Sequence, residues 1–88
     1  MTEITIQDET YNGWSNYETW NVSLWIQNNL FLYNTAAACV TYCGENETPY
    51  EKFIRCMTNC DEPQTQDGVA YNSPKVNQVE VNEMMKDL

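Results

Sequence analysis

The sequence has no histidine, only four basic residues and only three glycines among its 88 residues. Without histidine the chain lacks the most common general base near neutral pH, so Ser–His and Cys–His catalytic pairs are excluded. Three scattered glycines do not form a glycine-rich phosphate-binding loop. No stretch approaches the roughly 20 apolar residues that a membrane-spanning helix needs. We therefore expect a protein that is not an enzyme, that has no cofactor or metal and that is not embedded in a membrane.

The charge is strongly one-sided, since thirteen acids stand against four bases and give a net charge of −9. The first 51 residues hold seven acids and no base. Such a charge repels nucleic acid and anionic lipid and attracts basic partners, although acidic surfaces also keep small proteins soluble. The opening stretch MTEITIQDET is acidic and polar where a secretory signal is basic and then apolar. We therefore expect a cytoplasmic protein that does not bind nucleic acid directly.

Length and composition predict one folded domain. A hydrophobic share of 42% and an aromatic share of 12% exceed those of disordered chains. We expect residues 1–12 to form a flexible or extended arm and residues 13–88 to form a single helical domain. The predicted class is mainly α, a small bundle of three to four helices with a helical hairpin. A minor two-stranded β element, in which residues 69–71 pair with the arm, is an open alternative.

The first helix is expected to begin at Ser15, because Ser15 and Glu18 have the spacing of a capping box. Trp14, ahead of this cap, fits a hydrophobic staple. Asn28–Asn29 marks the expected end, since asparagine tolerates the left-handed conformation at which helices stop. Two apolar edges run along the helix, one of Tyr17, Trp20 and Leu24 and one of Val22, Trp25 and Ile26.

Three further helices are expected. The second restarts at Leu30 or Phe31 and ends with Gly44 as its C-cap. The third follows the cap Thr48 and runs to about Cys60. The last is capped by Asn77. Its inward face is either Val79, Met84 and Leu88 or Val81, Met84, Met85 and Leu88.

The aromatic segment of residues 13–29 is the first candidate site. Aromatic residues at helical spacing usually form core, and a chain of this length needs one. Asn21 fits this less well, because a buried amide between two tryptophans needs hydrogen-bond partners. The residues interpreted as core or as a partner-binding aromatic surface are Trp14, Tyr17, Trp20, Asn21, Leu24 and Trp25.

Acidic loops form the second candidate site. Two pairs of them, Glu45 with Glu47 and Asp61 with Glu62, flank the two ends of the expected hairpin. The acidic loops are interpreted as a face that binds a basic partner. Adjacent acids in polar loops are also typical of plain solvated surface. The acids assigned to this face are Glu45, Glu47, Asp61, Glu62 and Asp67.

The four cysteines follow the pattern C-x3-C, twelve residues, C-x3-C. In an antiparallel helical hairpin, nested pairing brings Cys43 to Cys56 and Cys39 to Cys60. Three interpretations stay open: two disulfides that stabilise a thin core, a zinc site of four thiolates, or reduced thiols packed between the helices. Disulfides are disfavoured in the cytosol, because thiols are kept reduced there.

The stretch WSNYETWNVSLWIQNN followed by LYNTA resembles a group of short, uncharacterised proteins of bacteriophages, notably cyanophages, and of plasmids and their hosts. The matching positions are Asn16 to Trp25 and Leu32–Tyr33. The segments TPYEKFIRCM and DGVAYNSPKVNQVEVNEMMKDL are similar in character, whereas the cysteines lie outside the shared pattern. The resemblance implies a small protein of a mobile element, and such proteins often bind and inhibit a host machine.

Charge and resemblance together predict a protein that binds a host protein with a basic or nucleic-acid-binding surface. The sharpest form of this hypothesis is a DNA mimic that antagonises a restriction enzyme, a CRISPR effector or another nucleic-acid enzyme, with carboxylates in place of phosphates. Two alternatives are a cysteine-stapled or metal-stabilised helical module and a homodimer that hides part of the aromatic stripe.

Overall fold

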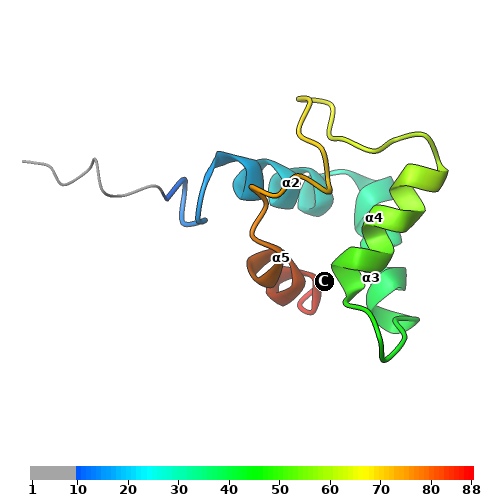
Figure 1. Ribbon diagram of the computed structural model, residues 1–88. Helices are drawn as coiled ribbons and strands as arrows, with labels where there is room; N and C mark the ends of the chain where they lie inside the picture. The colour runs from blue at the N-terminus through cyan, green and yellow to red at the C-terminus, as the bar shows by residue number, and fades with distance from the viewer. Residues whose placement is uncertain (1–9) are drawn as a thin grey trace, which may run out of the picture.

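The computed structural model describes residues 10–88. This part of the chain forms four helices, α2 (Tyr17–Asn28), α3 (Leu30–Thr41), α4 (Pro49–Asn59) and α5 (Gln78–Met85). Helix α2 packs against α3 and α5, and α4 packs against the same two helices. The connection between α4 and α5, yellow to orange in Figure 1, runs back from the end of α4 to α2 before it reaches α5. The predicted mainly helical class is confirmed.

The core draws apolar side chains from all four helices and from the α4–α5 connection. Phe53 of α4 lies near its centre, with its ring stacked on Tyr50 at 5.9 Å and edge-on to Tyr71 at 5.2 Å. Each fully buried large side chain stabilises the fold by roughly 1.5–3 kcal/mol. The buried apolar residues are Val22, Ile26, Leu32, Ala36, Cys39, Tyr50, Phe53, Met57, Val69, Tyr71, Val76, Val81, Met84 and Met85.

The inward face of α2 is the second of its two apolar edges. Val22 and Ile26 are fully buried, whereas Tyr17 is 39% and Leu24 is 37% exposed. Apolar residues surround most of this helix, so periodicity alone does not select the buried side. In α5 the alternative with Val81, Met84 and Met85 inward is confirmed, because Val79 is 71% exposed.

Three of the predicted helix starts are confirmed: the restart at Leu30 and the starts after Thr48 and Asn77. Thr48 and Glu51 form a reciprocal capping box at the start of α4, and the Asn77 side chain accepts a hydrogen bond from the Glu80 backbone N–H. The capping box predicted at Ser15 is wrong, because Asn16 is the N-cap of α2 and accepts from the Thr19 N–H at 2.9 Å. The Ser15 hydroxyl is instead used by Asn77, whose side-chain amide donates to it.

The junctions around α3 also differ from expectation. Asn29 has an extended backbone, with φ −110° and ψ 122°, not the left-handed one. It serves as C-cap of α2 and as N-cap of α3, where its side chain accepts from the Leu32 N–H. Helix α3 ends at Thr41 with Tyr42 as C-cap, so the prediction of Gly44 as the cap is wrong by two residues. Tyr42 closes the helix without left-handed geometry and so needs no glycine.

Extended pairing is minimal between residues 10 and 88. Ala70 forms an isolated bridge with Gln64, and Tyr11 forms one with Trp14, so residues 69–71 pair within their own connection. Residues 1–9 of the predicted arm lie outside the described residues. The two-stranded alternative therefore finds no support in the described part of the chain.

Candidate functional site

The five acids of the predicted acidic face lie at opposite ends of α4. Glu45 and Glu47 precede this helix, and Asp61, Glu62 and Asp67 follow it. Eleven helical residues separate the two groups, which corresponds to about 16 Å along the axis. The structure thus divides these acids between two sites.

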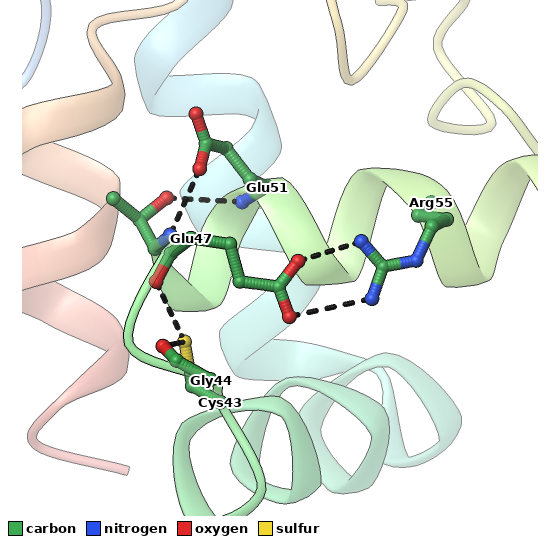
Figure 2. Close-up of polar contacts among 6 residues, drawn as sticks. Cys43, Gly44, Glu47, Glu51 and Arg55 are labelled. Atoms are coloured by element: carbon green, nitrogen blue, oxygen red, sulfur yellow. Dashed lines mark hydrogen bonds and ion pairs between the residues drawn. The ribbon is translucent and has the colours of Figure 1, made fainter.

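Glu47 is already paired within the protein. Its carboxylate accepts two hydrogen bonds from the Arg55 guanidinium, at 2.6 and 3.3 Å (Figure 2). These bonds hold the pKa of Glu47 below its usual range. The Glu47 backbone carbonyl also accepts from the Cys43 thiol at 3.0 Å. Glu47 therefore joins the end of α3 to the outer face of α4 and is a poor candidate for binding a partner.

Asp67 is likewise used by the fold. Its Oδ2 atom accepts hydrogen bonds from the Asn21 side-chain amide and from the Trp25 indole N–H, both at 2.8 Å. The bond from Asn21, and then that from Trp25, lowers the pKa of Asp67. Asp67 thus fixes the middle of the α4–α5 connection against α2. Glu45, Asp61 and Glu62 are the other exposed acids of the predicted set.

Asn21 is the centre of this contact, and its whole side chain is buried. Its carbonyl oxygen accepts from the Thr65 hydroxyl at 2.7 Å, and its amide also lies 3.4 Å from the Tyr17 hydroxyl. Thr65 in turn accepts from the Val69 N–H. We call Asn21, Trp25, Thr65 and Asp67 the Asn21 network. It supplies the buried amide with the partners that it requires, which is a structural role.

The outer side of α2 carries an aromatic cluster. The Tyr11 ring contacts Tyr17 at 5.4 Å and Trp20 at 4.8 Å, and Tyr17 lies 5.6 Å from Trp20. Leu24, one turn further along, is partly exposed. These side chains cover the start of the helix outside the main core.

Trp14 packs on the other side, toward α5, where it lines an open groove. Its walls come from the chain before α2, from Gln27 of α2, and from α5 and the residues that follow it. Glu80 is anchored there, because its carboxylate accepts from the Ser15 N–H at 3.0 Å. We call this the α5 groove, and it is lined by Gly13, Trp14, Gln27, Val79, Glu80, Glu83, Met84, Asp87 and Leu88.

Sequence reasoning missed the acids of the α5 groove. Glu80, Glu83 and Asp87 recur at i, i+3 and i+7, the same spacing that was used to predict apolar faces. The groove thus combines an acidic row with the apolar side chains of Trp14 and Leu88. This spacing is visible in the sequence itself, whereas the predicted acidic face consists of loop acids only.

The four cysteines are free thiols in the structure, in place of the nested disulfides considered above. Cys39 is buried, whereas Cys60 is exposed. Burial, with a smaller contribution from Cys56, raises the pKa of the Cys39 thiol to about 12. A thiol with such a pKa is a poor nucleophile near neutral pH.

Two other features, a metal-binding cluster and a membrane-spanning helix, are absent from residues 10–88. Within residues 10–88, no group of three or more cysteine, aspartate or glutamate residues is arranged to hold a metal ion. No helix in this part of the chain is long and apolar enough to cross a membrane.

The comparison with known families agrees with the extent of the described domain. The model of DUF7249, a family of unknown function, matches residues 7–88. No curated protein and no solved structure matches the chain. The match includes all four helices and the connection held by the Asn21 network. The chain therefore belongs to DUF7249, a family of unknown function.

Proposed function

We propose that this protein is a non-enzymatic binding protein whose α5 groove takes a basic, amphipathic segment of a partner protein. The observation that carries the proposal is the row of Glu80, Glu83 and Asp87 along a groove that also exposes apolar side chains. Lysines or arginines of a partner would meet the row, and its apolar side chains would meet Trp14 and Leu88. Charge and shape then select the same kind of ligand.

The position of these acids on α5 supports a binding role. Glu83 lies in the last turn of α5, and Asp87 follows the helix end. Negative charge at a helix C-terminus opposes the helix dipole by typically 0.3–1 kcal/mol. Lys86 offsets this only weakly, because its 3.7 Å pair with Glu83 is exposed. Helix stability therefore does not account for Glu83 and Asp87, whereas binding of a basic partner would.

A protein that binds the basic surface of its partner could act by blocking that surface. Basic amphipathic surfaces are common where enzymes bind nucleic acid, and an acidic protein seated there would exclude the substrate. The net charge of −9 would speed association with such a surface. Together with the resemblance to phage and plasmid proteins, this supports an inhibitor of a host defence or nucleic-acid enzyme that acts as a DNA mimic in the host cytoplasm.

The test compares two double charge reversals that change the net charge equally. Glu83→Lys with Asp87→Lys alters the α5 groove, and Glu45→Lys with Glu62→Lys alters the two loop sites. Tagged proteins are used to capture partners from nuclease-treated bacterial lysate, and captured proteins are identified by mass spectrometry. Affinity for the purified partner is then measured at low and high salt.

The groove variant is expected to weaken binding at least about tenfold, which corresponds to 1.4 kcal/mol. Its thermal stability should be unchanged or higher, because lysine suits a helix C-terminus. The loop variant should bind like the natural protein. Loss of binding in the loop variant alone would instead place the site at Glu45 and Glu62, and equal loss in both would leave only net charge as the cause.

A further inference from the structure

Helix α3 stands out in this acidic chain because neither it nor its neighbourhood in sequence is charged. Residues 19–44 contain no acid and no base. Yet α3 exposes large apolar side chains, with Leu30 76%, Phe31 56% and the C-cap Tyr42 74% accessible. Exposed apolar side chains gathered on one element mark an interaction surface more often than scattered ones do.

Four residues form a stripe on one face of this helix: Phe31, Thr35, Ala38 and Tyr42. They recur at i, i+4, i+7 and i+11, which places them on one side of the helix. All four line a shallow groove between α3 and α4. Lys52 is the one charged residue of this groove and belongs to the α4 wall. We call the four residues the α3 stripe.

The α3 stripe is symmetric about its own midpoint. Its ends are aromatic, Phe31 and Tyr42, and its centre is small, Thr35 and Ala38. If two such helices cross in antiparallel orientation at their centres, Phe31 of one copy faces Tyr42 of the other, and Thr35 faces Ala38. This is the reciprocal pairing that a two-fold interface requires. The small central residues allow the helix axes to approach closely.

We propose that the α3 stripe pairs with the α3 stripe of a second copy, so that the protein forms a two-fold dimer. Charge singles out a second copy as the occupant. Two chains of −9 repel each other over most of their surface, and the uncharged α3 face brings no acids against acids. A basic partner would gain nothing from this face, which offers it no carboxylate.

This interface is separate from the α5 groove, because the two surfaces share no lining residue. The dimer that the sequence suggests is a different one, because it would bury part of the aromatic stripe of α2. A dimer would carry two α5 grooves. Salt separates the two proposals, since screening strengthens association of two acidic chains and weakens binding of a basic partner.

Sedimentation equilibrium of the natural protein tests the proposal, over concentrations from about 1 µM to about 1 mM. Ala38→Glu adds a charge at the centre of the stripe, where the side chain is exposed, and circular dichroism checks that the helices persist. Thr58→Glu is the matched control, since it adds the same charge at an exposed site on α4.

The expected result is a mass that approaches twice that of the chain with rising concentration, with tighter association at higher salt. Ala38→Glu should weaken dimerisation at least about tenfold, while Thr58→Glu leaves it unchanged. A monomer at every concentration would overturn the proposal. So would a dimer that Ala38→Glu does not weaken, or that Thr58→Glu weakens equally.

Discussion

Helices α2 and α3 have the same length, twelve residues each, but their polar side chains bond to different parts of the chain. Polar side chains of α2 reach segments more than 40 residues away in sequence. Those of α3 hydrogen-bond within their own helix, as Thr35 does to the Phe31 carbonyl and Thr41 to the Ala37 carbonyl. The polar side chains of α2 therefore tie distant segments of the chain to this helix, whereas those of α3 do not.

The long-range bonds of α2 explain its unusual composition. Thr19 accepts from the Asn77 N–H at 2.8 Å, and the Asn16 amide donates to the Lys75 carbonyl at 2.6 Å. With the Asn21 network, they fix the α4–α5 connection at its middle and at its end. Residues 60–77 contain no helix, and these bonds add to the burial of Val69, Tyr71 and Val76 in holding the connection in place.

The largest expected effect is that of Asn21→Ala. It leaves the buried Thr65 hydroxyl without its acceptor and removes one of the two donors to the exposed Asp67 carboxylate. The free energy of unfolding should therefore fall by roughly 2 kcal/mol. Urea denaturation followed by circular dichroism measures this.

Two control variants, one in α2 and one in α3, test whether the loss of stability is specific to Asn21. Ser23 of α2 is as buried as Asn21, but its hydroxyl has no hydrogen-bond partner in the structure. Ser23→Ala should therefore leave stability unchanged or raise it slightly. Asn34→Ala, at an exposed position of α3, should change stability by less than about 0.5 kcal/mol. If all three substitutions have equal effects, the assigned difference between the helices is wrong.

A smaller effect is expected for Asp67→Asn, and it depends on pH. The pKa of Asp67 in the folded protein lies below its ordinary value of 3.8. Its contribution to stability is therefore complete well above pH 3.8 and is lost as pH falls through the lower, folded-state pKa. The Tm of Asp67→Asn should lie below that of the natural protein near neutral pH, and the two should converge in acid. Parallel Tm curves across this range would show that the carboxylate charge does not matter.

Local chemistry made much of the fold predictable from the sequence. The cap at Thr48, the cap at Asn77 and the restart at Leu30 each depend on neighbouring residues, and each is confirmed. The choice of Asn16 over Ser15 as the cap was not predictable. Asn77, which is distant in sequence, takes the Ser15 hydroxyl, and this competition is visible only in the folded chain.

The candidate site was less predictable for the same reason. Asp67 looked like any loop acid, because the donors that hold it lie more than 40 residues earlier on α2. Glu47 finds Arg55 across two turns of α4, a pairing that sequence spacing alone does not indicate. In contrast, the row of Glu80, Glu83 and Asp87 obeys helical spacing and could have been found by a search for acidic faces.

The most direct test of the central claim is amide hydrogen exchange in Asn21→Ala, measured by NMR. In the natural protein the N–H groups of Thr65, Gly68, Val69 and Tyr71 are all hydrogen-bonded within the connection. If the Asn21 network holds this segment, their exchange should accelerate by at least about tenfold, while amides at the centres of α3 and α4 change much less. Unchanged protection at Thr65 and Val69 would contradict the account and return Asn21 to the candidates for a binding surface.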